Sequence, residues 1–123
     1  MMERLRGAEG SPHCLDYPFK HRLIALAEAE ARLCRQSEPD DPRLAALRGA
    51  NARELELIVD EDGWPTTAEA GDEGTLAALR IALNATERPA FMRRCLTLMK
   101  AAVNRGDLPA AHAEELERRL AGL

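Results

Sequence analysis

Apolar side chains recur every three or four residues along most of this chain, which is the period of a helix that buries one face. The recurrence predicts five helical segments separated by short polar links, over residues 19–36, 42–60, 71–85, 89–105 and 107–120. β-branched residues are sparse and never alternate over the length of a strand, so no strand is predicted. We therefore expect an all-α fold, a compact single-domain bundle of four to five helices over residues 19–123. Residues 1–18 contain Gly, Ser and Pro without any period and are expected to form a loosely ordered N-terminal arm.

The links between the segments carry residues that start and end helices. Asp41 precedes Pro42, which predicts an N-cap followed by proline at the first helical position. Gly106 follows the fourth segment and is expected to cap its C-terminus. The third segment has two apolar ridges, so we expect a central helix that packs on more than one side. These ridges consist of Leu76, Leu79, Leu83, Ala77 and Ile81.

The corner between the second and third segments holds the only Trp of the chain, in the order Gly63-Trp64-Pro65. Gly63 is expected to adopt the left-handed conformation that ends a helix, and Pro65 keeps Trp64 out of helical geometry. Thr66 and Glu69 have the spacing of a capping box, so a short helical turn is expected before Gly71. Trp64 is interpreted as a plug that fixes the angle between the two helices, with its indole N–H bonded to a carbonyl or to water. A second interpretation is that Trp64 contacts a partner.

Composition and charge exclude several classes of function. The net charge of -4 and the pI near 5.4 argue against a general nucleic-acid binder and against docking on anionic lipid. The three Cys form no Cys-x-x-Cys pair, and Cys34 and Cys95 fall on predicted apolar faces. With no apolar leader and no apolar run of membrane-spanning length, we expect a cytoplasmic protein without disulfides.

The chain contains Asp62-Gly63-Trp64-Pro65, then Gly71, then Pro89-Ala90-Phe91. In these residues it resembles an uncharacterised, mainly bacterial helical family of unknown function. Its pattern is an acidic residue before Gly-Trp-Pro, a later Gly, a helix ending in Gln-His-Ala, then Pro-x-Phe and a last helix with Asp-Arg. Leu83-Asn84-Ala85 stands in place of Gln-His-Ala, and Arg118-Arg119 in place of Asp-Arg. The resemblance implies a helical fold in a divergent, shortened member that lacks the family's His and Asp, and it transfers no activity.

Motifs for metal binding and nucleophilic catalysis are weak. The acidic run 60–62 with Asp72 and Glu73 departs from an EF-hand, because Gly63 comes too early and Trp64 interrupts the loop. The His and Cys residues lack the short spacings of zinc sites. Neither Cys34 nor Cys95 lies at a predicted helix N-terminus, where a thiol would be activated. No metal site, no cofactor and no catalytic residue is therefore assigned.

Polar residues that interrupt apolar stripes are the strongest candidates for a site. They are Glu30 on the first segment, Asn51 on the second, and Arg80 and Asn84 on the third. Buried polar groups must find partners or they destabilise the fold. These residues either pair inside the bundle and fix helix register or line a pocket for a small polar ligand. We expect Arg80 to be mostly buried, with Glu30 as the first candidate for its partner.

The leading interpretation is a noncatalytic helical domain that acts by binding, either to a protein partner or to a second copy of itself. The alternative is a small-ligand-binding protein or an enzyme, such as a hydrolase, that uses the polar set Glu30, Asn51, Trp64, Arg80 and Asn84. A concave polar pocket favours the alternative, whereas a flat exposed apolar patch on the last two helices favours protein binding.

Overall fold

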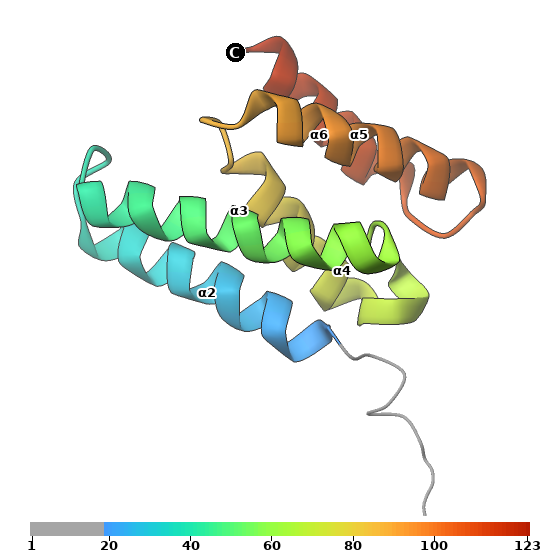
Figure 1. The fold of residues 1–123 in the computed structure, drawn as a ribbon, viewed down its shortest axis with the longest axis horizontal. Helices are drawn as coiled ribbons and strands as arrows, with labels where there is room; N and C mark the ends of the chain where they lie inside the picture. Colours follow the sequence, from blue (N-terminus) through green and yellow to red (C-terminus); the bar gives the residue numbers. More distant parts are fainter. Residues whose placement is uncertain (1–18) are drawn as a thin grey trace, which may run out of the picture.

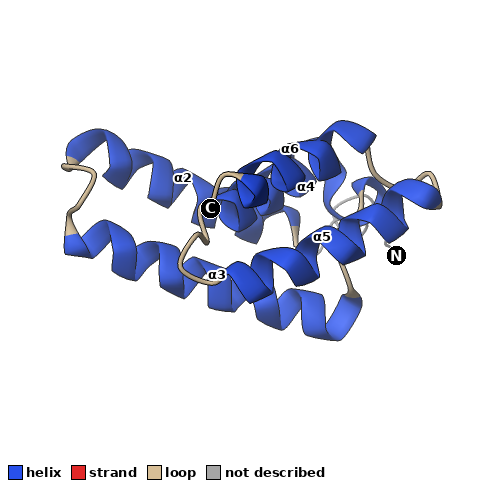
Figure 2. Ribbon diagram, turned by 90° about the horizontal axis from the view of Figure 1, so that it is seen from above, coloured by secondary structure: helices blue, strands red, loops and turns tan. Residues whose placement is uncertain are grey.

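The fold is all-α, as the apolar period predicts. The computed structural model describes residues 19–123, so the predicted arm over residues 1–18 and Cys14 lie outside the described residues. Within the described part every regular element is a helix and none is a strand (Figure 2). The helices are α2 Lys20–Gln36, α3 Pro42–Asp62, α4 Thr67–Leu83, α5 Pro89–Asn104 and α6 Ala110–Ala121.

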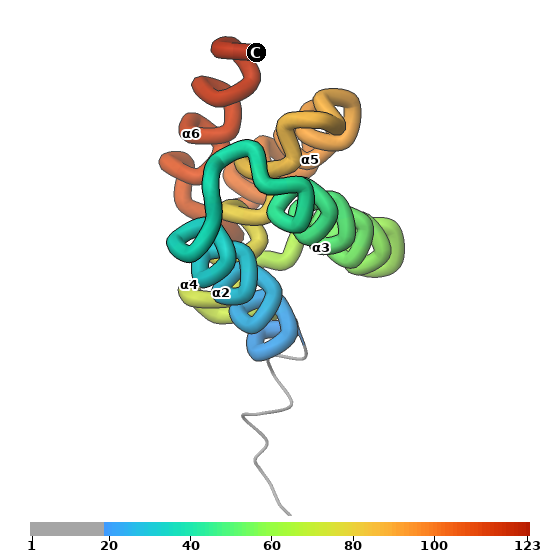
Figure 3. Tube along the Cα trace, turned by 90° about the vertical axis from the view of Figure 1, so that its left-hand side faces the viewer, coloured from blue at the N-terminus to red at the C-terminus, as the bar shows by residue number. Residues whose placement is uncertain are grey.

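Helix α4 occupies the centre of the bundle. Helices α2 and α3 lie side by side as a hairpin, and α5 and α6 form a second pair (Figure 1). The second pair stacks on one side of the hairpin (Figure 3), and α4 contacts both helices of each pair. The predicted central helix with two buried faces is therefore confirmed. In the described residues, no helix is long and apolar enough to cross a membrane.

Small side chains let α4 pack closely on its neighbours. Ala70, Ala77, Ala78 and Ala82 are all buried in the core. A Cβ at Gly74 would lie 2.9 Å from the Cβ of Ala70 and 3.2 Å from the Cα of Lys20, so only glycine fits this approach of α4 to α2.

The predicted helix ends are largely confirmed. The Asp41 carboxylate caps α3 by accepting from the Arg43 backbone N–H at 2.8 Å, with Pro42 at the first helical position. The Glu69 carboxylate accepts from the Thr66 backbone N–H at 3.3 Å, which completes the capping box of α4. The first turn of α4 is separated from the rest of the helix by Gly71, whose φ is 71°.

The Gly-Trp-Pro corner is buried and held from two directions. Gly63 has φ 77° and its N–H bonds to the carbonyl of Val59 at 2.9 Å, so it ends α3 as predicted. Trp64 is only 3% exposed and belongs to the main core cluster. Behind it, the Thr75 hydroxyl donates to the Pro65 carbonyl at 2.6 Å. The geometry agrees with Trp64 as a structural plug.

Candidate functional site

Three of the predicted polar residues meet in one hydrogen-bonded network. Glu30 on α2 is 3% exposed, and each of its carboxylate oxygens accepts from a different helix. Asn51 on α3 donates to Oε1 at 2.9 Å, and Asn84 at the end of α4 donates to Oε2 at 3.0 Å. The Asn51 amide also donates to the Leu26 carbonyl at 3.0 Å. The network therefore links α2, α3 and the C-terminus of α4 by direct bonds.

The predicted burial of Arg80 and its pairing with Glu30 are wrong. Arg80 is exposed, and the carboxylate of Glu30 bonds to the two Asn amides instead. The reason lies in the packing of α4, which leaves one narrow stripe of this helix in solvent. Positions 73, 76 and 80 follow the helix period along that stripe. Leu76, predicted to lie on an inner ridge, is 39% exposed for the same reason.

Trp64 lies apart from this network, so the structure does not bring it together with the other predicted site residues. Its ring is buried, as predicted for the plug. The Trp64 Nε1 atom is buried and has no hydrogen-bond partner within the described chain, so the predicted bond from the indole N–H to a carbonyl is wrong, while the bond to water stays a prediction. The ring belongs to the apolar core cluster of the bundle.

The two described cysteines differ in their surroundings. Cys95 is buried in the core, and desolvation raises the pKa of its thiol to about 12. Such a thiol stays protonated and is a poor nucleophile at neutral pH. Cys34 is exposed, which contradicts its predicted place on a buried face, because α2 turns that position towards solvent near its C-terminus. Both thiols are free.

His112, on the first turn of α6, is half-buried and its Nδ1 atom has no hydrogen-bond partner within the described chain. Desolvation lowers the pKa of this imidazole, and the charges of Glu115 and Asp72 act in the opposite direction. Among residues 19–123 no three His, Cys, Asp or Glu side chains are grouped so that they could hold a metal ion.

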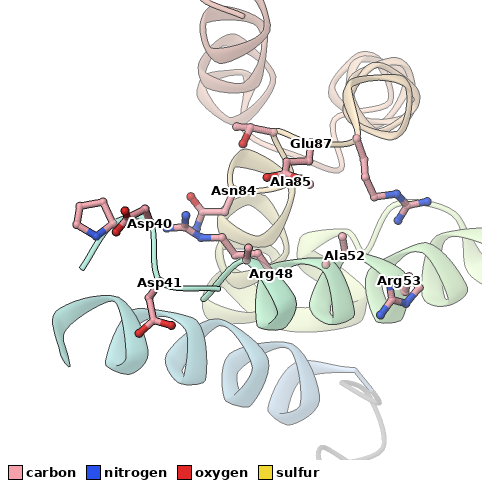
Figure 4. A pocket seen from close by; sticks show the side chains of 13 residues that line it. Asp40, Asp41, Arg48, Ala52, Arg53, Asn84, Ala85 and Glu87 are labelled. Atoms are coloured by element: carbon pink, nitrogen blue, oxygen red, sulfur yellow. The ribbon is translucent and has the colours of Figure 1, made fainter. Parts of the chain in front are cut away.

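A cavity of about 510 Å³ opens beside the network, and we call it the Asn84 pocket. Its walls are the α2–α3 link over residues 39–41, one face of α3 over residues 45–53, and the α4–α5 link over residues 84–88. Figure 4 shows Arg48 extending from α3 so that it lies near Asn84 and Asp40. Glu30 and Asn51 lie behind the wall and do not line the cavity. Asn84 is thus the one predicted site residue that reaches both the network and the pocket.

Two arginines that line the pocket each have one N–H group without a partner in the described chain. The Arg48 Nε atom and the Arg88 Nη1 atom are both buried, and neither forms a hydrogen bond within residues 19–123. Arg88 is held in place by an ion pair from Nη2 to Glu56 at 2.7 Å and by the ring of Phe91, 4.9 Å from its guanidinium carbon. Buried donors are nearly always paired in native proteins, so an acceptor from outside the chain, water included, would satisfy these two N–H groups.

The apolar stripes alone could not identify these arginines. Arg48 follows buried Leu44 by one helical turn and precedes buried Asn51 by three residues, so it borders the inner face of α3. A second signal is Gly49 in the middle of a long helix. Unlike Gly74, it is not needed for close packing, because a Cβ there would meet only the Arg53 Nη1 atom at 3.8 Å.

Comparisons of the chain with models of protein families, with curated proteins and with solved structures gave no match. The resemblance to the Gly-Trp-Pro family therefore stays a prediction.

Proposed function

We propose that this domain binds a small polar ligand in the Asn84 pocket and does not convert it chemically. The observation that carries the proposal is the cavity of about 510 Å³, whose lining includes Arg48 and Arg88, two arginines that each have one buried N–H group without a partner in the described chain. This volume is in the usual range for small-molecule sites, which combine a concave wall with a few placed polar groups.

The network behind the pocket supports this proposal by fixing Asn84. The Asn84 amide nitrogen bonds to Glu30 at 3.0 Å, so its carbonyl oxygen is directed away from that carboxylate. Asn51 in turn holds Glu30 against α3. A polar wall residue that is already oriented loses little side-chain entropy when a ligand binds.

The chemistry of the lining favours binding over catalysis. Among the described residues, the pocket is lined by no His, Cys, Ser, Tyr or Lys, and its unpaired carboxylates, Asp40 and Glu87, are exposed. Nucleophilic catalysis requires a nucleophile within hydrogen-bond reach of an oriented base. Neither group is present here as an oriented pair.

The apolar surface gives less support to the protein-interaction role. The large exposed apolar side chains of the described chain are Leu57, Leu76 and Leu123. They belong to α3, α4 and the residues after α6, so they do not form one face of α5 and α6. Binding to a protein partner or to a second copy remains a prediction from the sequence.

The test is to fill the pocket without disturbing the fold. Gly49→Leu places a side chain in the cavity from a position where a Cβ meets only the Arg53 Nη1 atom, at 3.8 Å, and it removes a helix-interior glycine. Ala46→Leu is the matched control, because Ala46 is exposed on the same helix and does not line the pocket. The wild type and both variants are screened by thermal shift against a panel of small polar metabolites, and hits are measured by calorimetry.

We expect at least one compound to stabilise the wild type and the Ala46→Leu variant but not the Gly49→Leu variant. A ligand at one hundred times its dissociation constant adds about 2.7 kcal/mol to the free energy of unfolding, which a melting curve resolves. Absence of any hit, or hits that bind the Gly49→Leu variant equally well, would overturn the proposal.

A further inference from the structure

The charged residues of the Asn84 pocket are not all available to a ligand. Its lining includes three arginines and three acidic residues. The Asp41 carboxylate pairs with Arg43 at 2.8 Å, and Arg53 lies further along α3, away from Asn84 (Figure 4). Arg88 already forms an ion pair with Glu56. The groups that remain are the Arg48 guanidinium on the positive side and the rim carboxylates on the negative side.

Arg48 and Asp40 carry opposite charges on the same side of the pocket. Figure 4 shows Asp40, Arg48 and Asn84 close to one another. Neither Asp40 nor Glu87 takes part in an ion pair within residues 19–123, and no direct contact within 4.0 Å joins Asp40 to Arg48. A cation and an anion that stand near each other without touching leave space for a molecule that carries both charges.

We propose that the ligand is a small zwitterion of the amino-acid class, with its carboxylate on Arg48 and its ammonium group on Asp40. This inference rests on the proposed function of the pocket. Arginine is suited to the carboxylate because its N–H groups match the two oxygens, and Arg48 lines the pocket without an ion-pair partner among residues 19–123. An ammonium group has three donors, which Asp40 and the Asn84 carbonyl oxygen accept.

The balance of charge in the pocket points to a zwitterion more than to a simple anion. A site for a polyanion gathers positive charge, as in phosphate sites that use several arginines. Here the unpaired carboxylates at the rim would repel a second negative group on the ligand. The same carboxylates attract an ammonium group, so both ends of an amino acid meet an opposite charge.

The inference is tested with three sets of probes. The first set is the twenty free amino acids. The second and third are, for the amino acid that binds best, the acid without its amino group and the amine without its carboxyl group. Affinities are measured by calorimetry for the wild type, Arg48→Gln, Asp40→Asn and the control Arg118→Gln, an exposed arginine on α6 that does not line the pocket. Circular dichroism melts verify that each variant is folded.

We expect an amino acid to bind the wild type and the Arg118→Gln variant equally. Removal of either charge from the ligand, or of its partner in Arg48→Gln or Asp40→Asn, should weaken binding about ten- to hundredfold. Equal affinity for the acid without its amino group, or no effect of Asp40→Asn, would overturn the zwitterion and leave pocket binding intact. If no amino acid binds, but another compound binds the wild type and not the Gly49→Leu variant, the inference fails and the proposed function stands. If no compound loses its binding in the Gly49→Leu variant, both the zwitterion inference and the proposed function fail.

Discussion

Replacing Trp64 by alanine tests whether the corner holds the bundle together. The ring is 3% exposed, so nearly all of its surface leaves water on folding. A buried aromatic side chain covers roughly 200 Å², which at about 25 cal/mol per Å² corresponds to roughly 5 kcal/mol. The unfolded chain already buries part of that surface, so the net loss is smaller. We expect Trp64→Ala to lower the free energy of unfolding by about 3–5 kcal/mol.

The unpaired indole N–H makes Trp64→Phe an informative companion. A buried donor without a partner destabilises the folded state by about 1–3 kcal/mol, and phenylalanine removes it. The smaller phenylalanine ring loses some packing contacts in the core, which lowers stability. The two effects oppose each other, so we expect the free energy of unfolding of Trp64→Phe to stay within about 1 kcal/mol of wild type.

Urea unfolding followed by circular dichroism measures both variants, because it does not depend on the Trp that is removed. In the wild type, Trp64 is the only Trp, so its fluorescence should shift to longer wavelength in the same transition. A Trp64→Ala variant that keeps its stability but loses a ligand or a partner would refute the plug. Trp64 would then be a recognition residue.

Three further predictions follow from the packing and the titrating groups. Gly74→Ala should lower the free energy of unfolding by about 1–3 kcal/mol, because the added Cβ would lie 2.9 Å from the Ala70 Cβ and 3.2 Å from the Cα of Lys20 on α2. In the control Gly49→Ala the added Cβ meets only the Arg53 Nη1 atom, at 3.8 Å, so urea titrations should show a gain of about 0.5–1 kcal/mol. Equal effects of the two substitutions would contradict the close approach of α2 and α4. Thiol labelling followed by mass spectrometry should modify Cys34 in the native protein and Cys95 only on unfolding, and native labelling of Cys95 at the rate of Cys34 would contradict its burial. Stability should also fall between about pH 9 and pH 12, because the Cys95 thiol ionises there in the unfolded chain but not in the folded protein. Folding lowers the pKa of His112, so below about pH 6.5 the unfolded chain binds a proton at this residue before the folded protein does, and stability should fall as the pH is lowered. Thermal melts across pH should show a weaker dependence in the His112→Gln variant. An unchanged pH dependence in that variant would rule out the contribution of His112.

The helical fold could be predicted from the sequence because each boundary carries its own local signal. The Asp41-Pro42 pair, the capping box of Thr66 and Glu69, and Gly63 act through the backbone of a few neighbouring residues. Such signals do not depend on how the helices pack. The fold class and most helix ends therefore follow from composition, period and caps alone.

Tertiary packing decides which side of each helix is exposed, and the sequence-based prediction of the buried side was wrong for α4. An apolar ridge on α4 included Leu76, yet the stripe of Leu76 and Arg80 faces solvent. Helix α4 is buried mainly through small residues, which contribute little to a hydrophobic stripe but allow close approach of neighbouring helices. The prediction from the apolar period relied on the large Leu side chains and therefore placed Arg80 on the wrong side of the helix.

The pocket could not be predicted because it forms where three separate segments meet. Residues 39–41, 45–53 and 84–88 are brought together only by the packing of α3 against α4. Arg48 and Arg88 carry no motif, and their unpaired donors become visible only when the surroundings of each nitrogen are known. The mid-helix Gly49 was the local sign that a side chain is missing from this wall.

The polar network and the pocket are parts of one arrangement, so the two interpretations of the polar residues do not exclude each other. Asn51 bonds only within the bundle, to Glu30 and to the Leu26 carbonyl, and it therefore fixes the position of α3 against α2. Asn84 bonds to the same carboxylate but lies on the pocket wall. Substitution of Asn51 should consequently act on stability, and substitution of Asn84 on binding. Glu30, which holds both, should affect the two together, since the orientation of Asn84 in the pocket depends on a buried group that no ligand touches.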